Sequence, residues 1–276
     1  MKELIAIFLS LMLQMTAFAQ VQEDTKVYQV NRWTTGGSAL VGFGTGALGF
    51  KIIREKEAIT FDELRALDQQ SLSPINRWVF DFDPTKTVEG QNISNTILQV
   101  SALMPLLLYI DRDIRQEWID ITLMYLQAQA LANNAYSYLG PISFDRYRPL
   151  AYNNTLSLEK RSDSNNKNSF FSGHTTTTAV SSFFMAQVLI DYHPHWSVPK
   201  KAMMYGFAAL PPALMSYFRF KAYKHFPTDT FTGLLIGAGI GVLIPTIHRQ
   251  NKLRKLSYVP YINEHSTGVV FAYKLY

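Results

Sequence analysis

The sequence contains no cysteine and carries little charge for its length. Without cysteine the chain has no disulfide scaffold, no thiolate metal site and no cysteine nucleophile. Charged residues make up 17% of the 276 residues, and the net charge of +5 includes no long run of one sign. This small basic excess gives no reason to expect a nucleic-acid partner. It favours anionic ligands weakly, and membrane orientation explains it equally well.

Apolar and aromatic residues are abundant, at 47% and 13% of the chain. Such a composition excludes a largely disordered chain. A chain of 276 residues can bury a sizeable core, and one domain of about 200–250 residues is expected. The mean hydropathy of −0.02 is low for a protein that lies wholly in lipid.

The first residues have the layout of a secretory signal peptide. Lys2 gives a short positive end, Leu4 to Leu13 is an apolar stretch, and Ala17-Phe18-Ala19 forms a cleavage signal before Gln20. Residues 1–19 are therefore predicted to be removed on export into a Gram-negative cell envelope. An uncleaved first helix is the alternative.

Residues 20–92 are predicted to form a periplasmic or surface segment with short helices. A glycine-rich apolar stretch, 38–53, is shorter and weaker than a typical membrane-spanning helix. Thr60 to Gln70 has the pattern of an amphipathic helix, capped by Thr60 with Glu63 three residues later.

Residues 93–247 are predicted to form an all-α bundle of five to six apolar helices that cross a membrane. The strongly apolar segments of helical length are Ile93–Ile110, Trp118–Tyr138, Gly173–Tyr192, Ala202–Phe218 and Asp229–Ile247. Pro211 and Pro212 should kink the fourth segment. Residues 248–276 are a basic linker and tail, in which Tyr258–Ile262 and Val269–Tyr273 resemble a short β-hairpin.

Basic residues fall on one side of this bundle if the five segments cross the membrane alternately. The clusters follow the last segment and precede the second and fourth, so their side is predicted to be cytoplasmic. The loops 140–172 and 219–229 then lie on the external side. A sixth crossing at 38–53 would break this parity, so that segment is expected to lie at the surface or to re-enter the membrane.

Ser172-Gly173-His174 stands where a polar loop enters a predicted helix. The free N–H groups and the positive end of a helix make such a place an anion site. Glycine there lets an oxyanion approach the backbone closely.

His225 and Asp229 lie around another predicted helix start, four residues apart. That spacing brings the aspartate within reach of the imidazole, where it can fix the tautomer and leave the other nitrogen as a nucleophile. Arg148 and Arg219 offer planar forks that match phosphate oxygens. With His174 as an acid, the set predicts phosphoryl transfer without a metal or other cofactor.

These residues resemble the three-part signature of the type 2 phosphatidic acid phosphatase (PAP2) superfamily: Lys-x6-Arg-Pro, Pro-Ser-Gly-His and Ser-Arg-x5-His-x3-Asp. The resemblance covers roughly residues 93–247 and implies an all-α bundle with a phosphohistidine intermediate. It implies that His225 is the nucleophile, Asp229 its orienting partner and His174 the general acid. The positions that match the phosphate-binding residues are Arg148, Ser172, Gly173 and Arg219.

The chain departs from this signature at three positions. Pro141 stands seven residues before Arg148, where the motif has its lysine, while Phe171 and Phe218 replace two smaller motif residues. Losing the lysine removes a charge-assisted contact, which costs roughly a few kcal/mol in the transition state. We hypothesise that Arg146 or Lys167 supplies the charge of the missing lysine.

The favoured function is hydrolysis of a lipid phosphate or diphosphate monoester in the inner membrane, with membrane lipids around the protein and the site facing the periplasm. Three alternatives stay open. The first is a soluble periplasmic acid phosphatase of the same superfamily. The second is a non-catalytic lipid-phosphate-binding relative, supported by Pro141. The third, more distant, is a vanadate-dependent haloperoxidase.

Overall fold

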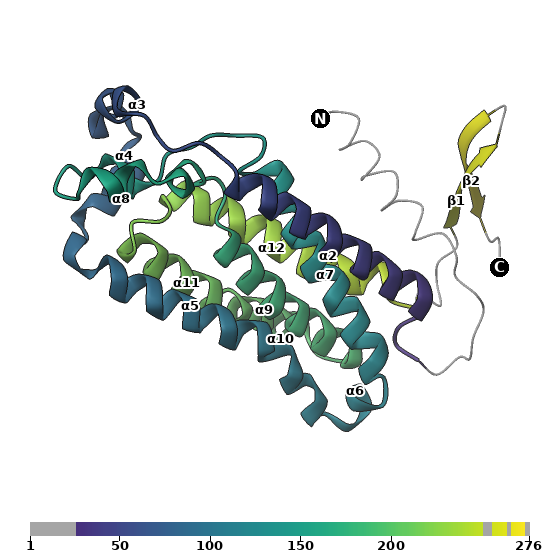
Figure 1. The fold of residues 1–276 in the computed structure, drawn as a ribbon. Helices are drawn as coiled ribbons and strands as arrows, with labels where there is room; N and C mark the ends of the chain where they lie inside the picture. Colours follow the sequence, from purple (N-terminus) through teal and green to yellow (C-terminus); the bar gives the residue numbers. More distant parts are fainter. Residues whose placement is uncertain (1–25, 251–255, 264–265, 274–276) are drawn as a thin grey trace.

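Long helices lie side by side in a bundle in the computed structural model (Figure 1). The structure describes residues 26–250, 256–263 and 266–273. The signal peptide expected over 1–19 lies outside the described residues and stays a prediction.

The helices follow the chain from α2 to α12. The long ones are α2 (Arg32–Arg54), α5 (Thr87–Leu103), α7 (Trp118–Leu139), α9 (Gly173–Tyr192), α10 (Val198–Ala208), α11 (Leu210–Lys221) and α12 (Pro227–His248). The short ones are α3 (Phe61–Ala66), α4 (Pro74–Arg77), α6 (Arg112–Gln116) and α8 (Leu158–Ser162). Two strands, β1 (Leu256–Asn263) and β2 (Ser266–Tyr273), pair in antiparallel fashion within the tail.

The helices match the predicted apolar segments closely, and the predicted all-helical bundle is confirmed. The fourth segment is divided at Ala209 into α10 and α11, with Pro211 in the first turn of α11. A proline lacks the backbone N–H that a helix interior needs, so the break at this place is expected. The fifth segment begins two residues earlier than predicted, at Pro227.

The glycine-rich segment 38–53 is regular helix and is longer than predicted, while its expected surface or re-entrant position stays a prediction. It lies within α2, a helix of 23 residues. A Cβ added at Gly42 would lie 2.9 Å from the Cβ of Ala130 on α7. Glycine therefore lets α2 and α7 approach closely, as small residues do between helices in membranes.

Polar residues of α7 face the interior of the bundle. Asn134 is 1% exposed, and its side-chain amide donates to the carbonyl of Gly42 at 2.6 Å. Gln127 donates to the hydroxyl of Ser38 at 2.9 Å. These hydrogen bonds satisfy polar groups that would be unfavourable in lipid or in an apolar core.

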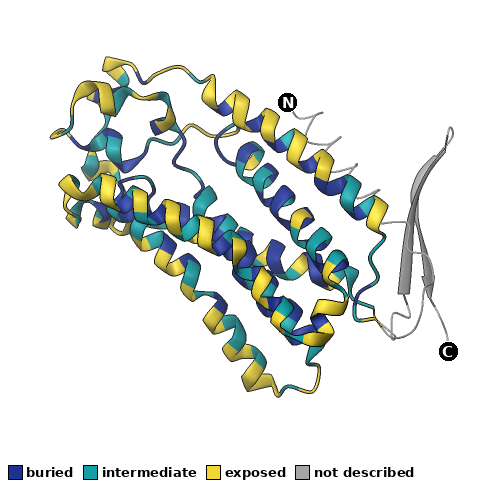
Figure 2. Cartoon of the chain, turned by 60° about the horizontal axis from the view of Figure 1, so that its bottom comes forward, coloured by how far each residue is buried: buried dark blue, intermediate teal, exposed yellow. Residues whose placement is uncertain are grey.

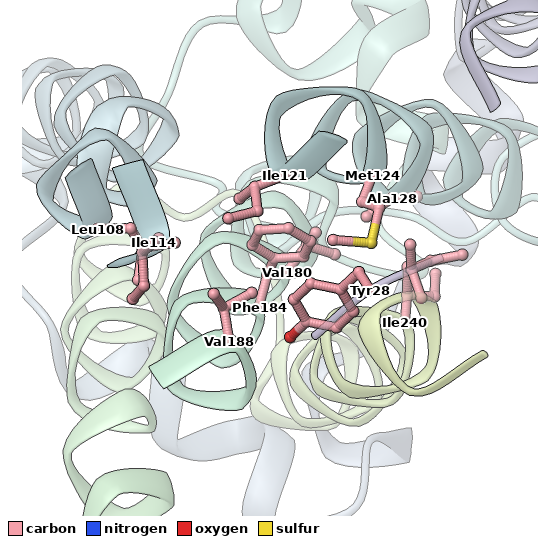
Figure 3. Packing of buried hydrophobic residues seen from close by; sticks show 12 residues of the cluster. Tyr28, Leu108, Ile114, Ile121, Met124, Ala128, Val180, Phe184, Val188 and Ile240 are labelled. Atoms are coloured by element: carbon pink, nitrogen blue, oxygen red, sulfur yellow. The ribbon is translucent and has the colours of Figure 1, made fainter. Parts of the chain in front are cut away.

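A cluster of buried apolar side chains fills the centre of the bundle (Figure 3). Phe184 and Val180 of α9 meet Ile121 and Met124 of α7 there, and Ile240 contributes from α12. The core thus joins α9 and α12, whose N-terminal ends carry predicted site residues.

Much of the outer surface of the long helices is apolar, and Figure 2 shows exposed residues along their outer faces. Within the described residues, three stretches are long and apolar enough to cross a membrane: Arg32–Arg54, Pro84–Ile110 and Pro227–His248. These features indicate membrane association. The predicted number of crossings stays a prediction, because α7, α9 and α10–α11 do not reach the same hydropathy over a sufficient length.

The short helices α3, α4 and α8 gather at one end of the bundle (Figure 1). The predicted capping box is present at α3: Thr60 accepts from the N–H of Glu63, and the Glu63 carboxylate accepts from the N–H of Thr60. The helix is shorter than predicted, because the chain turns away after Ala66.

Candidate active site

The three motif stretches meet at one end of the bundle. The backbone N–H of Ser172, just before α9, donates to the carbonyl of Asp229 at the start of α12, at 3.1 Å. The N–H of Leu150, two residues after Arg148, donates to the carbonyl of Tyr223 at 3.1 Å. The loops thus hold together residues that are far apart in sequence.

Arg148 and Arg219 are buried, with exposed fractions of 5% and 2%. Arg148 donates from Nε and Nη2 to the carbonyl of Asn168, at 3.3 and 3.2 Å. Arg219 donates from Nη1 to Gln91 at 3.1 Å and to Ser94 at 3.2 Å, and its Nε has no partner. Neither arginine forms an ion pair with any residue that the structure describes. Buried charges are normally paired, so two such guanidinium groups favour binding of an external anion.

The start of α9 adds backbone donors to this site. Ser172 is its N-cap, and the serine hydroxyl accepts from the N–H of Thr175 at 3.4 Å. The N–H groups of Gly173 and His174, in the first turn, have no acceptor within the described part of the chain. A Cβ at Gly173 would lie 3.0 Å from the ring of Tyr136, so glycine is needed for this close packing. The start of α9 thus has the backbone donors that the predicted anion site requires.

His225 is buried, with 1% of its surface exposed. Its Nδ1 lies 2.7 Å from the carbonyl oxygen of Ser169. Because a carbonyl can only accept, Nδ1 carries the proton and Nε2 keeps its lone pair. Burial, followed by the charges of Arg219 and Arg148, holds the pKa of His225 well below 6.5. The imidazole is therefore neutral at neutral pH and keeps a lone pair at Nε2.

Asp229 does not orient His225 directly, so the predicted contact across the four-residue spacing is wrong. One carboxylate oxygen accepts from the hydroxyl of Ser169 at 2.6 Å and from the N–H of Phe226 at 2.8 Å. The other accepts from Arg146 at 2.5 Å. The spacing turns the carboxylate back onto its own helix start, as in a capping box, and the carbonyl of Ser169 takes the place beside the ring.

His174 contacts α5, an element to which the motifs assign no site residue. Its Nε2 lies 3.1 Å from Oδ1 of Asn95. Asn95, Gln91 and Ser94 share one side of α5 and contact either His174 or Arg219. The sequence motifs do not include this side of the site. The signal that could have indicated it is the spacing of these polar residues, three and four apart in an otherwise apolar helix.

The two cations considered as substitutes for the motif lysine are both paired with carboxylates. Arg146 pairs with Asp229, and Lys167 lies 3.2 Å from Glu63. Each of these side chains neutralises a neighbouring charge. The hypothesis that Arg146 or Lys167 replaces the lysine is therefore not supported by their contacts.

Taken together, the site holds a neutral histidine, a second histidine, two arginines that form no ion pair with a described residue, and backbone N–H donors at the start of α9. Such a set can accept a phosphoryl group and stabilise its oxygens.

A family model described as PAP2 superfamily matches residues 117–253, which include every predicted site residue. Neither the comparison with curated proteins nor that with solved structures finds a match. Members of this superfamily are phosphatases, which supports a general phosphatase role. The chain belongs to the PAP2 superfamily.

Proposed function

We propose that the protein is a metal-independent phosphatase that hydrolyses a lipid phosphate or diphosphate monoester through a phosphohistidine. One observation carries the proposal: two buried arginines, which have no anionic partner in the described part of the chain, act on a histidine whose Nδ1 is held by a carbonyl. That combination suits a site for an anion that is attacked by nitrogen.

In the proposed reaction, Nε2 of His225 attacks phosphorus and forms an N–P bond. The P–O bond to the lipid breaks, and His174 gives a proton to the leaving oxygen. Water then attacks phosphorus, its proton passes to His174, and the N–P bond breaks to release phosphate. Arg148, Arg219 and the N–H groups of Gly173 and His174 hold the phosphoryl oxygens through both steps, with Ser172 as N-cap.

A lipid substrate is supported by the position of His174. The residue it contacts, Asn95, lies on α5, within a stretch long and apolar enough to cross a membrane. Large apolar side chains, including Val100 and Leu103, are exposed further along this helix. The leaving group protonated by His174 would thus depart beside a lipid-facing helix. We place the protein in the inner membrane of a bacterial envelope, with the site on the periplasmic side.

The soluble alternative within the same superfamily fits these apolar outer surfaces poorly, because a soluble protein rarely exposes such continuous patches. The non-catalytic alternative rests on one observation, the proline at position 141. It predicts phosphate binding without turnover.

The test is phosphate release in EDTA by the purified protein and by His225→Ala, over a panel of lipid phosphates and diphosphates and one soluble aryl phosphate. Ser216→Ala is a matched control, because its hydroxyl contacts only the carbonyl of Pro212 on its own helix. Release by wild type and the control but not by His225→Ala supports the proposal. Phosphate binding without release from any substrate would favour the non-catalytic relative.

A further inference from the structure

The place where the motif lysine would stand offers no free cation. The ammonium of Lys56 reaches the carbonyl of Pro141, but it also pairs with Asp145 at 2.6 Å. Arg146 and Lys167 are paired with carboxylates as well. If the site has a further cation, another part of the chain must supply it.

Lys224 occupies such a position. It lies in the connection between α11 and α12, directly before His225, and its N–H donates to the carbonyl of Arg219 at 3.1 Å. Its ammonium has no ion-pair or hydrogen-bond partner among the residues that the structure describes. The charge of Lys224 nevertheless acts on Arg148, Arg219 and His174, so it belongs to the same electrostatic cluster.

Lys224 also lines a cavity of about 290 Å³. Two other lining residues contact the arginines: Gln91 accepts from Arg219, and the carbonyl of Asn166 accepts from the N–H of Arg148 at 2.7 Å. The remaining charged residues of this cavity are Lys160 and Asp163. The half-buried Lys224 thus shares this cavity with residues that contact both arginines.

We propose that Lys224 is a phosphate-binding residue that supplies the cation missing at Pro141. The proposal rests on the proposed function of the same site. A lysine directly before the nucleophile would approach the phosphoryl oxygens from the cavity side, whereas the motif lysine would approach from the loop that contains Arg148. Lysine is a suitable phosphate ligand because its ammonium acts as a compact point charge with three donors.

The titration of Lys224 adds a measurable signature. Burial, then the charges of Arg148 and Arg219, lowers the pKa of Lys224 to about 8, and Asp163 opposes this shift. Lys160 also lines the cavity, the charge of Lys224 acts on His174, and His225 follows Lys224 directly in the chain. The ammonium is charged below its pKa, so phosphate binding by the free protein should weaken as the pH rises through about 8.

The experiment measures the Kd of inorganic phosphate and the steady-state kinetics of the full chain from pH 6 to 10. It compares wild type with Lys224→Ala, Lys224→Arg and Lys221→Ala. Lys221 is the matched control, because it lies three residues away and pairs with Glu89 at 2.8 Å. Lys224→Ala should raise the Kd of phosphate about ten-fold or more and abolish the weakening near pH 8. Lys224→Arg should restore much of the affinity and move that weakening to higher pH, and Lys221→Ala should match wild type.

A Lys224→Ala protein that binds phosphate as tightly as wild type, with the same pH dependence, overturns the inference. So does a wild type that binds no phosphate. Loss of turnover in His225→Ala together with normal phosphate binding and turnover in Lys224→Ala leaves the proposed function standing and removes only the role of Lys224.

Discussion

Nδ1 of His225 and the carbonyl oxygen of Ser169 lie 2.7 Å apart. The hydroxyl of the same serine donates to Asp229 at 2.6 Å. Ser169 therefore stands between the motif aspartate and the motif histidine. Asp229 positions the ring through Ser169, by fixing the residue whose carbonyl selects the tautomer of His225.

Ser169→Ala should lower kcat about ten-fold with little change in KM, since the lost hydroxyl frees the peptide that orients His225 but touches no substrate. Ser169→Thr, which keeps the hydroxyl, should recover part of the loss. Steady-state kinetics with Ser216→Ala as control measure both effects. A Ser169→Ala protein with wild-type kcat, beside an inactive Asp229→Ala, would show that Asp229 acts on the ring by another route.

The pH dependence of kcat/KM should show its acid limb well below 6.5. Burial and then the charges of Arg219 and Arg148 lower the pKa of His225, so the proposed nucleophile stays neutral as the pH falls below 6.5. The measurement uses two substrates whose phosphate groups have different pKa values. An acid limb caused by the substrate shifts between the two, whereas one caused by the enzyme stays at the same pH. An enzyme limb at pH 6.5 or above contradicts the assignment of a low pKa to the nucleophile.

The seam between α9 and α12 depends on glycine at selected positions. A Cβ at Gly237 would lie 2.7 Å from the Cβ of Ala179 on α9, whereas one at Gly239 would meet nothing within 4 Å. Gly237→Ala should destabilise the protein by about 1–3 kcal/mol through overpacking and reduce kcat, because α9 and α12 both carry site residues. Gly239→Ala should leave activity unchanged. Thermal unfolding in detergent and kinetics provide the comparison, and equal behaviour of the two variants would show that the seam is not tightly packed.

The site end and the opposite end of the bundle should lie on different sides of the membrane. The chain has no cysteine, so Glu159→Cys in α8 and Ser197→Cys before α10 give single, exposed labels. In spheroplasts a membrane-impermeant maleimide should label the first and spare the second until the membrane is lysed. Equal labelling of both before lysis, or release of the protein by carbonate, would favour the soluble alternative.

The long helices could be predicted because their apolar segments are long and bounded by polar loops or prolines. The length of α2 is underestimated from the sequence for a physical reason. Glycine lowers hydropathy and helix propensity in a sequence window, but Gly42 and Gly49 serve as contact points for α7, which only the packed structure reveals.

The sequence predicts which residues form the site better than it predicts their contacts. From the order of the motifs and the predicted helix starts, we expected Arg148, Arg219, His174 and His225 to lie together, and the structure brings them to one end of the bundle. The side chain of Asp229 could not be placed by spacing, because its partners Ser169 and Arg146 come from a loop some sixty or more residues away in sequence. Long-range loop contacts leave no local periodic signal.

Trapping the phosphoryl group on the enzyme tests directly whether His225 is the nucleophile. The protein would be mixed with a substrate labelled in the transferred phosphate, quenched within one turnover, and mapped by mass spectrometry under alkaline conditions that preserve phosphohistidine. We expect label on His225 alone, absent from His225→Ala and unaffected by EDTA. Label on any other residue, or turnover that persists in His225→Ala, would contradict it.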